Sequence, residues 1–230
     1  MKIINSSVEL LDITENALQK IERAGRTCYK SEDKITDTSA EAFCKMIQTR
    51  NHESVIEHAY ASFLIVCDRG VSHEIVRHRL ASYSQESTRY CNYGEDKKGM
   101  VFIRPAWISE GDLAYAYEWL NSVKYHQFGG YNDDKQLGIT CGFIGLLESC
   151  EDNYNEFISQ GWTPQQARSV LPNCLKTEIV MTANFREWKH FLKLRCAPAA
   201  HPDMRVVANM IRDVLVSKYP VIFSDSEREV

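Results

Sequence analysis

The stretch 59–68 reads AYASFLIVCD and is dense in aromatic and β-branched residues, which predicts a strand. Its apolar centre, residues 63–67, is far shorter than the roughly 20 residues that a membrane-spanning helix requires. Residues 68–70 (Asp-Arg-Gly) supply a turn, and Ser72 is the expected N-cap of a short helix that reaches His78. This part of the chain is therefore expected to form a strand followed by a short helix.

Helices and strands alternate irregularly outward from this strand. Further helices are predicted over residues 14–24, 39–50, 109–128, 135–160, 185–195 and 202–218, and strands over 2–11 and 177–184. Gly25 is expected to cap the first of these helices, and Thr163 followed by Pro164 to begin another. Residues 80–100 are polar and predict a loop. This order predicts an α+β fold, in which long helices pack with an antiparallel or mixed sheet, in a single domain over residues 1–230.

Three glycines mark one face of the helix predicted over 135–160. Gly138, Gly142 and Gly145 follow one another at spacings of four and three residues. A helix face that carries only small residues permits another helix to approach closely. A functional glycine loop is the alternative, which the helical spacing disfavours.

Composition and charge narrow the possible functions. Lysine and arginine number 27 against 31 aspartates and glutamates, and the net charge of -4 disfavours a general nucleic-acid or anionic-membrane binder. Eight cysteines are scattered without a Cys-x-x-Cys pair, and the apolar start of the chain breaks at Asn5, too early for a signal-peptide core. We therefore expect reduced thiols in a cytoplasmic protein.

Arginine clusters are the strongest sign of a ligand. The sequence lacks a Gly-x-Gly-x-x-Gly fingerprint, a P-loop and a Gly-x-Ser-x-Gly elbow, so a bound nucleotide would need another device. Residues 77–89 contain three arginines and one acid, and residues 186–195 contain four basic residues and one acid. Arginine holds two phosphate oxygens in its planar fork and keeps its charge. Both segments are candidate phosphate sites, with solvated helix faces as the alternative.

The histidines raise a metal hypothesis. Residues 52–58 and 73–78 concentrate histidine and glutamate, but a His-Glu-x-x-His zinc site needs its second histidine where Arg77 stands. The guanidinium would also repel a cation, so no metal is expected. A metal-dependent hydrolase stays an alternative, and its ligands would be His52, His58, His73 and His78.

Several blocks of the chain resemble the flavin-dependent thymidylate synthases. Arg77-His78-Arg79, followed after seven residues by Ser87 and then by Arg89-Tyr90, is similar to that family's signature. Supporting blocks occur in the family's order at residues 52–58, 167–172 and 184–186, and at Arg195. Together the blocks cover about residues 50–205, and their combination is highly specific.

This resemblance implies a homotetrameric enzyme with that family's α+β fold, which makes deoxythymidine monophosphate (dTMP) from deoxyuridine monophosphate (dUMP). Methylenetetrahydrofolate would supply the carbon, and NADPH would reduce a bound FAD that supplies the hydride. The implied FAD contacts are His52, Ser54, Arg77, His78, Arg79, Gln85, Asn184, Arg186 and His190. The implied nucleotide contacts are Glu74, Arg77, Gln85, Glu86, Ser87, Thr88, Arg89, Arg168 and Arg195. No nucleic-acid or membrane partner is expected.

Arg195 is the expected catalytic residue. The resemblance places it against the uracil carbonyl and N3, where activation of C5 develops negative charge that a fixed guanidinium would stabilise. Glu74 and His190 depart from the family's pattern, since many relatives carry glutamine and asparagine at these places. The Pro-Cys-His setting of other thymidylate synthases is missing, so Cys174, two residues after Pro172, is expected to be a packed thiol.

The alternative from another class is an arginine-rich module that binds single-stranded nucleic acid without redox activity. Tyr83, Tyr90 and Tyr93 lie in or beside the first arginine cluster and could stack on bases. The net charge of -4 disfavours this alternative. Its signature would be a steep loss of oligonucleotide affinity with salt.

Overall fold

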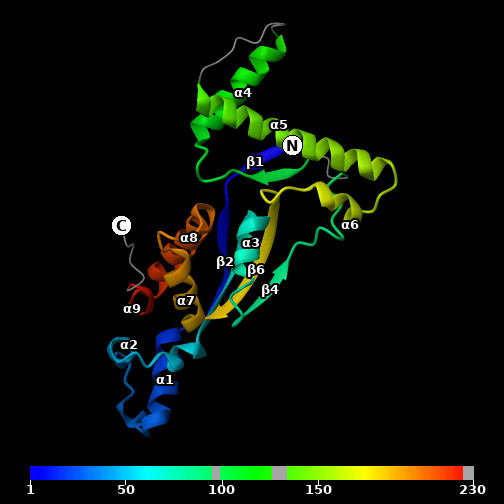
Figure 1. The fold of residues 1–230 in the computed structure, drawn as a ribbon. Coiled ribbons are helices and arrows are strands. Elements are labelled where there is room, and N and C mark those ends of the chain that lie inside the picture. The colour runs from blue at the N-terminus through cyan, green and yellow to red at the C-terminus, as the bar shows by residue number, and fades with distance from the viewer. Residues whose placement is uncertain (95–98, 126–133, 225–230) are drawn as a thin grey trace. The chain divides into compact units, whose positions relative to one another are not determined.

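The computed structural model describes residues 1–94, 99–125 and 134–224 (Figure 1). The chain divides into two compact units. The first unit contains Met1–Asn5, Asp68–Gly70 and Glu86–Lys176; the second contains Ser6–Cys67, Val71–Gln85 and the residues from Thr177 onward. Each unit has its own core, and a single catalytic domain over 1–230 stays a prediction.

The second unit is a sheet covered by helices. Its strands are β2 (Ser7–Ile13), β3 (Tyr60–Asp68), β4 (Ala81–Gln85) and β6 (Lys176–Asn184), where Asp68 and Lys176 already belong to the first unit. Its helices are α1 (Ala17–Tyr29), η1 (Glu32–Lys34), α2 (Ser39–Thr49), η2 (Glu53–His58), most of α3 (Arg69–Ile75), α7 (Phe185–Arg195), α8 (Pro202–Lys218) and α9 (Pro220–Phe223). The strand order is β2-β3-β6-β4, and β2 and β4 run antiparallel to β3 and β6 respectively.

The core of the second unit lies between this sheet and helices α7 and α8 (Figure 1). Along β3, Ala61, Phe63, Ile65 and Cys67 alternate with half-buried residues and are 0% exposed, which is the pattern of a strand with one covered face. Trp188 on α7 packs edge-on to Phe63 and donates its indole N–H to the Ala61 carbonyl at 3.0 Å. The strand predicted over 59–68 is confirmed, and it anchors α7.

The first unit is mainly helical. Its elements are β1 (Lys2–Ile4), β5 (Val101–Ile103), α4 (Glu110–Tyr125), α5 (Lys135–Ser159), α6 (Pro164–Ala167) and η3 (Arg168–Val170). β1 and β5 pair in parallel, and Phe102 of β5 packs with Leu147, Tyr154 and Leu175 in a buried cluster. The amino group of Met1 pairs with Glu151 at 2.8 Å and ties the start of the chain to α5.

The predicted fold class is confirmed. Predicted helices 39–50, 135–160, 185–195 and 202–218 match α2, α5, α7 and α8 within one residue at each end, and α6 begins at Pro164 after Thr163. The helix predicted over 109–128 matches α4, although residues 126–128 lie outside the described residues. In the described ranges, every helix is too short or too polar to span a lipid bilayer.

Two predictions near the N-terminus are wrong. The single strand expected over 2–11 is two strands, because β1 pairs with β5 in the first unit and β2 pairs with β3 in the second. Gly25 does not cap α1, which continues to Tyr29 and ends where Lys30 adopts φ 49°. Gly25 is instead a packing position, because a Cβ there would lie 2.4 Å from Cζ of Phe43.

Two predictions around the first arginine cluster are also wrong. α3 begins at Arg69 directly after β3, so Ser72 is a buried residue inside the helix and not its N-cap. The loop expected over 80–100 contains strand β4, which pairs with β6 from Ala81↔Ala183 to Gln85↔Ile179. Residues 95–98 of that predicted loop lie outside the described residues.

Candidate functional site

Helix α7 carries most of the candidate site in the second unit. Asn184 caps it, because its side-chain oxygen accepts a hydrogen bond from the Glu187 N–H at 2.9 Å. Phe185, Trp188 and Phe191 fix the helix in the core. Arg186 and His190 lie between these buried residues in the sequence and are exposed on another face of the helix. Arg195 is the last residue of the helix.

A cavity of about 920 Å³ lies beside α7 within the second unit. Its lining includes Leu80, Asn184, Arg186, Glu187, His190 and Lys193. Three of the nine predicted FAD contacts, Asn184, Arg186 and His190, therefore meet in one cavity, and its size is in the range of cofactor pockets.

Ion pairs hold the cations of this cavity in place. Arg186 pairs with Glu57 at 2.6 Å, and Lys189 pairs with Glu53 at 2.8 Å and donates a hydrogen bond to Gln48. Glu53 and Glu57 come from η2, so this segment packs against α7. An anionic ligand in this cavity would compete with the two carboxylates for the N–H donors of Arg186 and Lys189.

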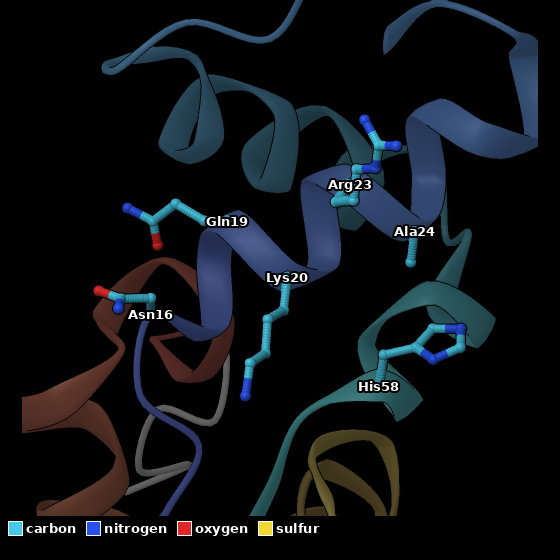
Figure 2. A pocket seen from close by; sticks show the side chains of 6 residues that line it. All are labelled: Asn16, Gln19, Lys20, Arg23, Ala24 and His58. Carbon is cyan, nitrogen blue, oxygen red and sulfur yellow. The ribbon is translucent and has the colours of Figure 1, made fainter.

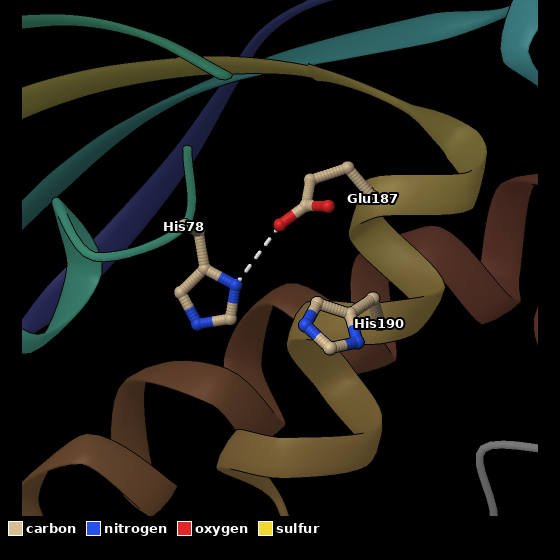
Figure 3. A group of neighbouring side chains, drawn as sticks. All are labelled: His78, Glu187 and His190. Carbon is tan, nitrogen blue, oxygen red and sulfur yellow. Dashed lines mark hydrogen bonds and ion pairs between the residues drawn. The ribbon is translucent and has the colours of Figure 1, made fainter. Parts of the chain in front are cut away.

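Arg195 is the centre of a second group of side chains in the same unit. Its Nη1 pairs with the Glu74 carboxylate at 2.6 Å, its Nη2 donates to the Glu74 carbonyl at 3.1 Å, and its Nε donates to Nε2 of His78 at 3.1 Å. The other ring nitrogen of His78, Nδ1, lies 3.0 Å from Oε1 of Glu187 (Figure 3). Glu74 is thus neutralised by Arg195.

The charge state of His78 follows from these contacts. Burial lowers the pKa of His78 below its ordinary value, Arg195 and His190 act in the same direction, and the bond to Glu187 opposes them. Because Arg195 can only donate, Nε2 must carry a lone pair, and the proton of the neutral ring is then on Nδ1. His78 therefore donates to Glu187 and accepts from Arg195.

These contacts disfavour a metal at this place. In the described part of the chain, His78, Glu187 and His190 form the one group of three or more possible metal ligands whose ligand atoms lie within 4.8 Å of one another (Figure 3). A cation on Nδ1 of His78 would need the ring proton on Nε2, where Arg195 already donates. Of the four histidines of the hydrolase alternative, His78 alone is in this group.

The other predicted FAD contacts of the second unit are less closely grouped. His52 and Ser54 are exposed on and beside η2, and Arg77 and Arg79 are exposed after α3. The amide of Gln85 donates to Ser72 at 2.8 Å and to Thr177 at 3.2 Å, so its donor side is used inside the unit.

The remaining predicted nucleotide contacts gather in the first unit. Arg168 at the start of η3 donates to the hydroxyl of buried Thr88 at 3.1 Å. The Arg89 N–H lies 3.3 Å from Oγ of Ser87, and its guanidinium lies 5.5 Å from the Tyr90 ring centroid. Arg168 is thus linked to the segment 87–89, which carries a second arginine and two hydroxyls, and these residue types suit a phosphate.

Glu86 is held differently from its neighbours. Tyr93 donates to its Oε1 at 2.6 Å, and Lys176 pairs with its Oε2 at 2.9 Å. Its carbonyl accepts from Arg69 at 3.2 Å. Because both carboxylate oxygens already bind protein groups, Glu86 supports the segment 86–89 from within the unit.

The sequence did not predict the contacts of Glu187, Tyr93 and Lys176. Glu187 was counted only as an acid within a basic segment, although its place three residues after Asn184 is that of a residue facing the N-cap. Tyr93 and Lys176 both bind the Glu86 carboxylate, although they lie 7 and 90 residues from it in the sequence, and no local pattern predicts such contacts.

A second hollow, of about 500 Å³, lies beside α1 (Figure 2). Its lining is Asn16, Gln19, Lys20, Arg23, Ala24 and His58, most of which are exposed. It contains none of the predicted site residues, apart from the hydrolase alternative's His58, so we assign it no role.

Replacing Cys174 by serine is expected to leave turnover within about twofold of the wild type. All eight cysteines are free thiols, and burial raises the pKa of Cys174 to about 11, so about one part in 10⁴ is thiolate at pH 7. Burial also raises the pKa of Cys196, although Arg195 precedes it. Iodoacetamide labelling with peptide mass analysis should modify exposed Cys28 well before Cys174; rapid loss of activity through alkylation of Cys174 would contradict the expectation.

Comparisons with known proteins find a matching family and similar proteins. The model of the family described as "Thymidylate synthase complementing protein" matches residues 9–221. The flavin-dependent thymidylate synthase of Geobacter sulfurreducens is 31% identical over 226 residues, which are 95% of this chain and 86% of that protein. The enzyme of the same name from Corynebacterium efficiens is 34% identical over 212 residues, 91% of this chain and 79% of that protein.

Two solved structures share the fold. A UMP/dUMP methylase of Streptomyces cacaoi, bound with 5-Br dUMP, has a TM-score of 0.76 at 22% identity and covers 97% of this chain and 96% of its own. Thymidylate synthase X of Helicobacter pylori, solved with FAD and dUMP, has a TM-score of 0.71 at 23% identity and covers 96% and 98%. At this identity the two likenesses establish the fold.

Proposed function

Because the chain belongs to the family of flavin-dependent thymidylate synthases, we propose that it converts dUMP to dTMP. Methylenetetrahydrofolate is the carbon donor, and NADPH is the source of reducing equivalents. The observation that carries the proposal is the family match over residues 9–221, which includes both arginine clusters. The relatives favour this enzyme over the nucleic-acid-binding alternative.

The residues of the second unit fit FAD. The cavity beside α7 combines cations for a diphosphate with the amide of Asn184, the ring of His190 and the apolar side chain of Leu80. Arg186, Asn184 and His190 would hold the cofactor there, with His78 buried behind them. When bound and reduced, FAD supplies the hydride that completes the new methyl group.

Arg195 would act on the uracil ring. Uracil is a poor carbon nucleophile, and activating its C5 places negative charge on the ring carbonyl oxygen and on N3. Glu74 and His78 hold three of the five N–H donors of Arg195, so its guanidinium is fixed in orientation before substrate arrives. A preoriented cation stabilises developing charge without first having to reorganise.

Arg168 and Arg89 would hold the substrate phosphate in the first unit. Both side chains are placed by protein contacts, Arg168 by Thr88 and Arg89 by Gln165. Ser87 would take part in binding and not in nucleophilic attack, because a serine needs a neighbouring base to become reactive.

The exposed face of α5 supports a homotetramer. A Cβ added at Gly138, Gly142 or Gly145 would meet nothing within 4 Å, and the neighbouring Ile139 and Leu146 are more than half exposed. The close approach expected of these glycines is therefore available to another copy of the chain. Light scattering after gel filtration should give four times the chain mass, and Leu146→Lys should lower this measured mass.

We also place the protein in the cytoplasm, where its eight free thiols stay reduced.

The function is tested by spectra and product. Protein purified with FAD should be yellow, its flavin absorbance should bleach with NADPH under anaerobic conditions, and dTMP should form only when dUMP and methylenetetrahydrofolate are both present. Omission of each reactant in turn is the control. Colourless protein that takes up no FAD would contradict the proposal, and tight salt-sensitive oligonucleotide binding would favour the alternative.

A further inference from the structure

Glu187 lies at the buried end of a chain of hydrogen bonds that leads to Arg195. Its side chain is 6% exposed and that of His78 is 3% exposed. Oε1 of Glu187 lies 3.0 Å from Nδ1 of His78, and Nε2 of His78 lies 3.1 Å from Nε of Arg195 (Figure 3 shows the first of these contacts). The three side chains therefore connect the first turn of α7 to its last residue through one imidazole ring.

The ring can join these two partners in only one protonation state. A carboxylate accepts and a guanidinium donates, so the proton must be on Nδ1 and the lone pair on Nε2. In the other neutral tautomer, two donors would face each other at Arg195 and two acceptors at Glu187. In the doubly protonated ring, Nε2–H would again oppose Nε–H of Arg195.

We infer that Glu187 is a positioning residue for Arg195, which it orients by fixing the tautomer of His78. The expected effect on turnover rests on the proposed function, whereas the tautomer of His78 can be tested independently of that function. Glu74 holds the two terminal nitrogens of Arg195 from one side, and His78 holds Nε from the other. Two of the five N–H donors remain for a ligand, and their direction is set by these three bonds.

A structural role for Glu187 predicts a different outcome. Glu187 also contacts the N-cap through its backbone, but that bond uses its N–H and is kept by any residue other than proline at this place. If the carboxylate served stability alone, its loss would lower the melting temperature and leave the tautomer of His78 and the kcat of folded protein unchanged. A carboxylate that orients a metal-bound histidine is typically worth about 10–100-fold in activity, and we expect a loss in the same range for Glu187.

Three variants separate these possibilities. Glu187→Gln keeps an acceptor for Nδ1–H without the charge. Glu187→Leu removes the acceptor at similar size, and Glu187→Asp keeps the charge but withdraws the oxygens by one methylene. If Glu187→Leu does not fold, Glu187→Asp takes its place in the comparison. Each is compared with the wild type as full-length FAD-loaded protein, after thermal unfolding has shown that it is folded.

The first readout is the ¹⁵N spectrum of histidine-labelled protein, with the His78 signals assigned by their loss in His78→Gln. In the wild type and in Glu187→Gln, Nδ1 should be of the protonated type and Nε2 of the unprotonated type. In Glu187→Leu and Glu187→Asp, this single state should be lost. A wild-type His78 with its proton on Nε2, or protonated on both nitrogens, would overturn the inference even if dTMP formation were normal.

The second readout is the split between kcat and KM. We expect Glu187→Leu and Glu187→Asp to lower kcat by about 10–100-fold with KM for dUMP changed much less, because an oriented Arg195 matters most as charge develops. Glu187→Gln should keep at least ten times the kcat of the Leu variant. Equal kcat values for Gln and Leu would overturn the inference. A wild type that forms no dTMP would instead contradict the proposed function, while the spectrum would still decide the tautomer.

Discussion

Replacing Arg195 by alanine is expected to lower kcat for dTMP formation by about 10²–10³-fold, the usual cost of removing one donor to a developing oxyanion. FAD content should not change, because the cavity lined by Asn184, Arg186 and His190 does not include Arg195. The loss should appear mainly in kcat, since the charge that Arg195 stabilises is greater in the transition state than in bound dUMP.

Two further variants test whether the loss of kcat has a cause other than the lost charge stabilisation. Arg195→Ala leaves the Glu74 carboxylate without its cation, so part of its effect is local repulsion. Arg195→Lys keeps a positive charge near Glu74 but cannot make all three bonds, and it should recover only part of the lost kcat. Arg50→Ala, at an exposed residue that follows α2, is the matched arginine control. Undiminished kcat in folded, FAD-loaded Arg195→Ala would remove Arg195 from the chemistry.

Local patterns predicted those parts of the fold that have a single strong period. β3 alternates large apolar residues with half-buried ones, and α7 and α8 have regular apolar faces, so all three were predicted nearly to the residue. β4 was missed because its inward residues are Ala81, Tyr83 and Gln85 with serines between them, and its stability comes from pairing with β6, about 100 residues later. Gly25 was misread because the side chain that requires it, Phe43, belongs to another helix.

In the candidate site, too, contiguous motifs could be recognised from the sequence, whereas contacts between distant residues could not. The residues of contiguous blocks, such as 86–89 and 184–186, could be proposed from the sequence because each block resembles a motif of the family. The bonds that orient the functional groups join distant positions: His78 and Glu187 are 109 residues apart, and Glu74 and Arg195 are 121 apart. A single sequence carries no record of such pairings, so the role of Glu187 and the pairing of Glu74 with Arg195 emerge only from the structure.

Replacing Arg168 by alanine is expected to raise KM for dUMP by about 10–150-fold, while kcat changes by less than about fivefold. A hydrogen bond to a charged group contributes about 1.5–3 kcal/mol, and 1.4 kcal/mol corresponds to a factor of ten. The phosphate is far from the reacting C5, so Arg168 binds ground state and transition state nearly equally, and the loss belongs in KM. Ala167 is buried next to Arg168, which keeps the backbone in place when the side chain is shortened.

A thermodynamic cycle tests whether Arg168 contacts the phosphate, by combining the removal of the Arg168 side chain with the removal of the phosphate from the ligand. Dissociation constants for dUMP and for deoxyuridine, which lacks the phosphate, are measured by calorimetry on the wild type and on Arg168→Ala. If Arg168 binds the phosphate, the wild type should prefer dUMP strongly and the variant should lose about 10–150-fold of that preference, because both changes remove the same interaction. Lys135→Ala, at an exposed lysine that begins α5 in the same unit, should keep the full preference. An equal loss of affinity for both ligands in Arg168→Ala would mean that Arg168 shapes the unit without touching the phosphate, and the anchor would then be sought at Arg89.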